Sequence, residues 1–147
     1  MFVEQILPRA RERLAVITAS GLVRHAAEVM AQPHIDLVVV CDHGVMVGVV
    51  TKTDILAQLD RHRFEPCFDT RLDAIMTREV ISCRPSDSLP DLWLMMNKRD
   101  IHRIPVVDAA QRPVGVVYGR DALQTLLQEA QIEDGQLRDY IMGVGYR

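Results

Sequence analysis

The chain has 147 residues, of which 48% are hydrophobic and 25% charged, and its formal net charge at pH 7 is -3. This composition is that of an ordinary globular domain, and the negative charge argues against binding nucleic acid by bulk electrostatics. No apolar run approaches the roughly 18 residues of a membrane span, and residues 1–13 carry scattered charges where a signal peptide would be apolar. We therefore expect a cytoplasmic protein that binds neither membrane nor nucleic acid.

The cysteines indicate neither a disulfide framework nor a zinc site. Cys41, Cys67 and Cys83 are odd in number and form no CxxC pair. Asp42 and His43 follow Cys41, but three neighbours in one turn cannot close around a metal ion. We expect reduced, structural thiols and no metal cofactor.

The first elements along the chain are a strand and a helix. Residues 14–18 form a short β-rich run, and the helix after it is expected to end near Pro33. The apolar residues of this helix fall on one face, at Leu22, Ala26, Val29 and Met30.

A hairpin and a second helix come next. Residues 35–41 and 45–50 are nearly unbroken β-branched runs, separated by a turn at 42–44. Such runs are typical of strands covered on both faces. A helix is expected over residues 51–59, with three residues turned inward: Ile55, Leu56 and Leu59.

The second half repeats this order after a polar stretch, residues 60–71, that we interpret as a surface linker. Leu72, Ile75 and Met76 echo Val3, Ile6 and Leu7 before the first strand of each half. A strand is expected at 80–83, a helix with the stripe Leu89, Trp93 and Met96, strands at 104–107 and 114–118, and a helix at 122–130. In the tail, Leu137, Tyr140 and Ile141 predict a short helix that packs on its own module or, alternatively, on another chain.

The two halves are copies related by an offset of 67 residues. Valines and leucines account for most of the matches, but Gly48/Gly115 and Asp54/Asp121 are hard to explain by packing. A copy of about 60 residues buries little surface alone. The prediction is an α/β (α+β) fold in which two βαββα repeats, at 1–60 and 72–130 with a tail at 131–147, pack sheet to sheet with pseudo-twofold symmetry.

Three segments resemble the signatures of cystathionine β-synthase (CBS) domains: Gly48–Asp54, Leu72–Thr77 and Ile101–Asp108. The resemblance covers nearly the whole chain and implies a tandem CBS pair, or Bateman module. Such a pair is a regulatory sensor that binds adenosine-containing ligands in clefts between its halves. The ligand it implies is an adenine nucleotide (AMP, ADP or ATP) or a related adenosyl compound such as S-adenosylmethionine or NAD.

The first strand-to-helix junction has the chemistry for such a ligand. Thr51 is expected at the start of a helix, where free backbone donors favour an anionic group, and Asp54 one turn later suits two ribose hydroxyls. The same spacing is also a capping box, which is the commoner arrangement. In the second copy Tyr118 replaces the threonine while Asp121 remains, which favours a ribose contact there, although an acid in a helix's first turn is also mildly favourable.

His102 and Arg103 are candidates for phosphate binding, because arginine's fork suits phosphate oxygens. Alternatively they are a strand-entry pair facing water. Their counterparts in the first copy are Ile35 and Asp36, so phosphate-bearing ligands are expected to bind strongly at one site per chain, in the second copy.

The remaining candidates are weaker. Ile104 and Val106, with Pro105 between them, are candidates to line an adenine slot, or are simply core residues of a strand. Arg120 is a candidate phosphate contact or a solvated helix residue, and Ser82 and Thr18 are candidates to touch a base edge.

Two functions follow from this sequence. The favoured one is a non-enzymatic ligand sensor acting on an effector protein, and the alternative is a structural or oligomerisation module with empty clefts. No nucleophile, base and orienting group can be assembled for an enzyme. A homodimer is expected, since residues 92–96 carry more apolar surface than one inward stripe can hide, with Trp93 or Leu94 at the interface.

Overall fold

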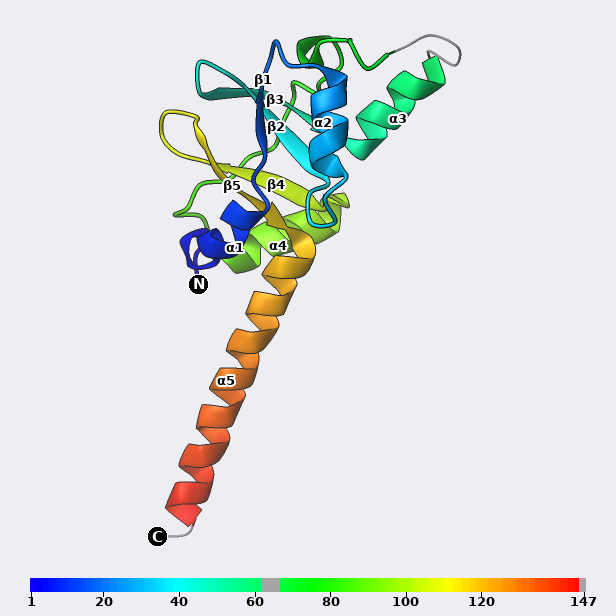
Figure 1. Cartoon of the computed structure of the whole chain (residues 1–147). Helices are drawn as coiled ribbons and strands as arrows, with labels where there is room; N and C mark the ends of the chain where they lie inside the picture. Colours follow the sequence, from blue (N-terminus) through cyan, green and yellow to red (C-terminus); the bar gives the residue numbers. More distant parts are fainter. Residues whose placement is uncertain (62–66, 146–147) are drawn as a thin grey trace.

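The computed structural model describes residues 1–61 and 67–145, with side chains described through Gly135 in the last helix. Two small sheets lie face to face, and a long C-terminal helix extends away from them (Figure 1). The predicted fold, two α/β repeats packed sheet to sheet, is confirmed. Its elements follow the order of the two predicted copies.

The first repeat contains a three-stranded sheet with two helices. Strand β1 (Val16–Thr18) runs parallel to β2 (Leu37–Asp42), which pairs antiparallel with β3 (Val45–Thr51). The helices are α2 (Val23–Met30) and α3 (Lys52–Arg61). The hairpin turn places His43 and Gly44 at φ values of 52° and 80°, and positive values at both central residues give the twist that a two-residue hairpin needs.

The second repeat contains a hairpin between two helices. Strands β4 (Arg103–Val107) and β5 (Pro113–Tyr118) pair antiparallel between α4 (Leu89–Arg99) and α5 (Gly119–Gly145). Ser88 caps α4 by accepting a hydrogen bond from the backbone N–H of Asp91 at 3.3 Å. The helix ends at Asp100, which is left-handed with φ 55°.

The strand predicted at residues 80–83 does not form, and that prediction is wrong. Only Cys83 bridges to Val106, donating to the carbonyl of Pro105 and accepting from the N–H of Val107. The next bonds of a parallel ladder would need N–H groups on Pro85 and Pro105, which proline lacks. The first repeat has Val38 in place of Pro105, and its third strand forms.

The lead segments of the two repeats are exchanged. The 3-10 helix η1 (Val3–Ile6), followed by α1 (Leu7–Glu12), packs into the core of the second repeat with Leu89 and Ile104. The matching 3-10 helix η2 (Leu72–Ala74) packs into the core of the first repeat with Val38. The sequence echo between these segments therefore marks two equivalent structural positions.

A shared cluster of buried side chains joins the two sheets. It contains Leu37, Val39, Cys41, Val49, Val116 and Tyr118, from β2, β3 and β5. These strands are buried on both faces, as their unbroken apolar runs predicted.

One other sequence expectation needs correction. Leu56 and Leu59 do not turn inward with Ile55: their exposed fractions are 64% and 38%, and Gln58 is buried instead. The described part of the predicted linker contacts the first repeat, because Cys67 is buried and the carbonyls of Phe68 and Thr70 accept hydrogen bonds from α2. Residues 62–66 lie outside the described part of the chain.

The tail is not a separate short helix. It continues α5 to Gly145 and projects away from the repeats (Figure 1). The side chains of Leu137, Tyr140 and Ile141, on which the packing prediction depended, lie outside the described residues.

Candidate functional site

In the first repeat, Thr51 and Asp54 form a reciprocal cap at the junction of β3 and α3. The Asp54 carboxylate accepts from the Thr51 N–H at 2.9 Å, and the Thr51 hydroxyl accepts from the Asp54 N–H at 3.2 Å. The capping box stated as the alternative is therefore present. The Thr77 hydroxyl lies 3.4 Å from both Asp54 oxygens, and Asp54 remains half-buried. In the part of the chain that the structure describes, its carboxylate accepts only from neutral groups.

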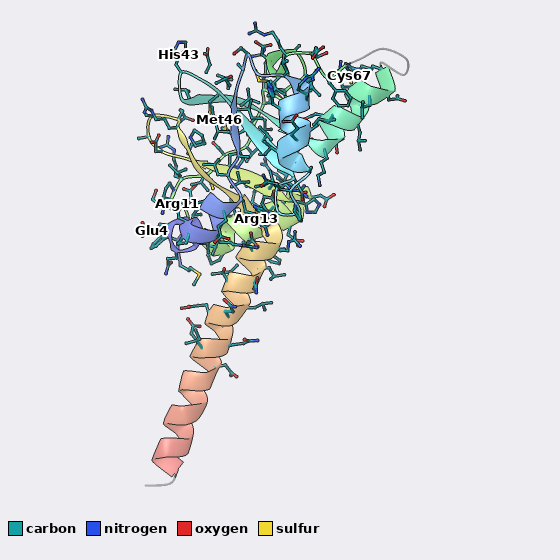
Figure 2. All side chains as sticks on the ribbon, in the orientation of Figure 1. Glu4, Arg11, Arg13, His43, Met46 and Cys67 are labelled. Carbon is teal, nitrogen blue, oxygen red and sulfur yellow. The ribbon has the colours of Figure 1, made fainter. Side chains whose placement is uncertain are left out.

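In the second repeat, the matching Asp121 is paired with an arginine. Arg13 Nε donates to Asp121 Oδ2 at 2.9 Å, and a second guanidinium nitrogen donates to Oδ1 at 3.1 Å. Arg13 and Asp121 are 3% and 6% exposed, and Figure 2 shows Arg13 beside the start of α5. Hydrogen bonding to Asp121 is the main cause that raises the pKa of Arg13, against the effect of burial.

Arg103 is also paired, with Asp36, the residue at the equivalent position in the first repeat. Its guanidinium donates to Asp36 Oδ2 at 2.7 Å, and Lys52 Nζ lies 2.9 Å from Asp36 Oδ1. The bond from Lys52, and then that from Arg103, lowers the pKa of Asp36 below its usual value, although burial opposes this. Asp36, the first-copy counterpart of Arg103, thus neutralises the cation that we expected to bind a phosphate.

Tyr118 connects these two ion-pair groups. Its ring lies 4.3 Å from the Arg13 guanidinium carbon and 5.3 Å from that of Arg103, within range of cation–π attraction. Its hydroxyl accepts from the backbone N–H of Asp36 at 2.8 Å. The residue that replaces the capping threonine therefore spans both repeats.

A pocket of about 370 Å³ lies between α4 and the start of α5. His102, Arg103 and Arg120, predicted separately as phosphate contacts, all line it, and Trp93, Met96 and Leu123 give it an apolar side. His102 and Arg120 are exposed, and His102 Nε2 lies 3.2 Å from Asp100 Oδ1.

The other predicted residues are not in this pocket. Ile104 and Val106 belong to the core cluster of the second repeat, and Pro105 is buried between them. Thr18, at the end of β1, and Ser82, before the bridge at Cys83, are both exposed. Thr51 and Asp54 lie at the opposite junction, in the first repeat.

Sequence reasoning missed Arg13, Lys52 and Thr77. Arg13 and Thr77 lie in the exchanged lead segments, which touch the sites only because each crosses to the other repeat. Lys52 and Thr77 were detectable, since each lies in a motif already quoted, Gly48–Asp54 and Leu72–Thr77. Within the described residues, no group of three His, Cys, Asp or Glu side chains is placed to hold a metal. No described helix is long and apolar enough to span a membrane.

The family model of the CBS domain matches this chain twice, at residues 3–61 and 72–128. A curated relative, L-aspartate semialdehyde sulfurtransferase of Methanocaldococcus jannaschii, is 31% identical over 100 residues, which is 67% of this chain but 18% of that protein. CBS domain-containing protein YhcV of Bacillus subtilis is 28% identical over 71% of this chain and 73% of its own. This chain spans from about a fifth to a third of the first three curated relatives it matches.

A solved structure with a similar fold has ligands bound. It is the CBS domain pair of protein MJ0100 in complex with 5'-methylthioadenosine and S-adenosyl-L-methionine, with a TM-score of 0.72 and 25% identity, covering 88% of this chain and 98% of that one.

Proposed function

The chain belongs to the CBS domain family, and on that premise we propose that it is a regulatory sensor of an adenosine-containing ligand. The observation that supports this best is the Thr51–Asp54 junction, where a half-buried carboxylate faces the exchanged segment of the other repeat through Thr77. A carboxylate whose partners are neutral is suited to accept from the two hydroxyls of a ribose.

The groups around Asp54 fit an adenosyl ligand with an anionic or polar tail. Lys52 lies in the first turn of α3, where the helix dipole also favours negative charge. The MJ0100 pair is in complex with 5'-methylthioadenosine and S-adenosyl-L-methionine, which favours sulfur-containing adenosyl compounds, and AMP, ADP, ATP and NAD remain candidates. The protein acts without catalysis in this proposal, through an effector protein, in the cytoplasm.

A thermal-shift series tests the proposal. With ligand at about 100 times its dissociation constant, binding stabilises the folded state by roughly 2.7 kcal/mol, or roughly 5 to 10 °C for a chain of this size. The series compares 5'-methylthioadenosine, S-adenosylmethionine, AMP and ATP with GMP. Asp54→Asn is expected to reduce the shift to about half or less, whereas Asp42→Asn, the same change at the hairpin tip, is expected to preserve it. Unchanged melting with every adenosine ligand at millimolar concentration would favour a structural module with empty clefts.

We also propose that two chains pair through their helical faces. Leu94 on α4 is 58% exposed, and Leu123 and Leu127 are exposed on α5, the helix that α4 contacts. One amphipathic stripe cannot bury them, so a second copy would cover them in a twofold interface.

Leu94→Glu is expected to yield folded monomers, because it brings like charges close together across the twofold axis. Ile81→Glu, at an exposed apolar residue outside the helices, should leave the dimer intact. Sedimentation analysis measures both, and a wild-type monomer at tens of micromolar would contradict the pairing.

A further inference from the structure

The two aspartates that the repeat places at equivalent positions are not equally available to a ligand. Asp121 has both carboxylate oxygens bound by one guanidinium, at 2.9 and 3.1 Å. Arg9 Nε also lies near this carboxylate, 3.6 Å from Oδ1. Among the described residues, Asp54 accepts only from the N–H and hydroxyl of Thr51 and from the hydroxyl of Thr77.

The arginine is held in place by more than the aspartate. A guanidinium nitrogen of Arg13 donates to the carbonyl of His34 at 3.0 Å, and the Arg13 guanidinium stacks over the Tyr118 ring. It is contributed by the crossed lead segment, whose Ala10 lies against Gly115 on β5. A ligand could reach Asp121 only by displacing a buried, fully paired cation, which would cost much of its binding free energy.

This arrangement has no counterpart in the first repeat. At the offset of 67 residues, the equivalent of Arg13 is Val80, which has no charge to offer Asp54. A ribose diol and a bidentate guanidinium approach the same two carboxylate oxygens. Because Asp121 is buried and Arg9 also lies beside Oδ1, its remaining lone pairs are not open to a ribose.

We infer that Arg13 occupies the second cleft as an intramolecular substitute for a ribose, so that each chain binds one adenosine ligand, at Asp54. This rests on the proposed sensor function and specifies which cleft serves it. It reverses the expectation from His102 and Arg103 that the second copy holds the strong site, because the partner of Arg103 is already Asp36.

Calorimetric titration with 5'-methylthioadenosine tests this inference, because that probe has no phosphate and so is independent of the basic pocket. The wild type is expected to bind one molecule per chain. Asp54→Asn should weaken binding about tenfold or more, the effect of losing charge-assisted hydrogen bonds. The double variant Arg13→Gln/Asp121→Asn keeps a neutral hydrogen-bonding pair in place of the buried ion pair, and its affinity should stay within about threefold of the wild type.

Freeing Asp121 tests the role of Arg13 directly. Arg13→Gln is expected to raise the stoichiometry from one to two ligands per chain. Arg13→Lys, which keeps the charge but cannot bind both oxygens in parallel, is the second variant if the glutamine variant folds poorly, and it should add a weaker second site.

The outcomes separate this inference from the sensor function. Two equal sites in the wild type, or loss of binding in Arg13→Gln/Asp121→Asn with retention in Asp54→Asn, would overturn the inference and leave the sensor function standing. If both Arg13 variants still bound one ligand per chain, Arg13 would not be the group that keeps the ligand out of the second cleft. Absence of binding by the wild type and every variant would overturn both.

Discussion

The two repeats place an aspartate at the same position and surround it with opposite chemistry. Asp54 caps its own helix through Thr51 and is half-buried, whereas Asp121 is buried and neutralised by Arg13 from a distant segment. The difference begins with two substitutions: Tyr118 for the capping threonine, and Arg13 where the other lead segment has a valine. A duplicated fold therefore does not imply duplicated sites, because residues outside the motif determine what the motif can bind.

Removal of the buried Arg13 cation is expected to have the largest effect on stability, and it tests this comparison most directly. Arg13→Met is expected to destabilise the protein by about 3–5 kcal/mol, since it leaves the Asp121 charge buried without a partner. Asp54→Ala, in the first repeat, should cost only about 0.5–2 kcal/mol, the value of a helix cap. Urea unfolding measures both.

The double variant Arg13→Met/Asp121→Leu is the control for that test. Replacing both charges by apolar side chains of similar size should recover most of the lost stability, because no unpaired charge remains. If Arg13→Met cost no more than Asp54→Ala, the ion pair would contribute little to the fold.

Features that depend on one element could be predicted from the sequence, whereas features that depend on pairing or packing between elements could not. Local pattern predicted both hairpins and the helices after them, because β-branched runs and apolar spacing act within one element. It failed at residues 80–83, where Pro85 and Pro105 remove two ladder donors that only the pairing register reveals. Leu56 and Leu59 also satisfied helical spacing but lie on the exposed face of α3.

The site was less predictable than the fold. Arg13 and Asp121 are 108 residues apart, and the internal repeat gives no hint of their contact because they are not equivalent positions. Asp36 and Arg103 are equivalent, at an offset of 67, yet a comparison of copies shows only that they differ in charge. That they touch follows from the pseudo-twofold packing, which brings strand β4 of one repeat against the entry to β2 of the other.

A second prediction tests whether the exchanged lead segments approach both sheets equally. A methyl group added at Gly48 would lie 2.8 Å from the Thr77 carbonyl oxygen, and one added at Gly115 would lie 2.8 Å from Ala10 Cβ. Both distances are too short for real contacts. Gly48→Ala and Gly115→Ala should therefore each destabilise the protein by about 1–3 kcal/mol, because the lead segments must shift.

Gly135→Ala is the matched control, since it adds the same methyl group to α5 where no described atom outside the neighbouring helix backbone lies within 4 Å. It should be neutral or stabilising by up to about 1 kcal/mol, as expected for alanine in a helix. Thermal unfolding compares the three variants. A neutral result at only one of the first two glycines would mean that the two crossings are not equivalent.

The smallest expected effect concerns Asp36, the acid that joins the repeats through Lys52 and Arg103. Its pKa is lowered in the folded protein from the usual 3.8, so its ionised form stabilises the fold. That contribution is fully present above the unfolded pKa, and it is lost as pH falls through the lower folded pKa. Asp36→Asn should thus cost about 1 kcal/mol at pH 7, a modest value because the pair is partly solvated. The difference from the wild type should shrink as the solution is acidified below about pH 4. Urea unfolding at a series of pH values measures it, with Asp42→Asn as the control for an exposed aspartate. A difference that stayed constant down to acid unfolding would mean that the charge of Asp36 does not hold the two repeats together.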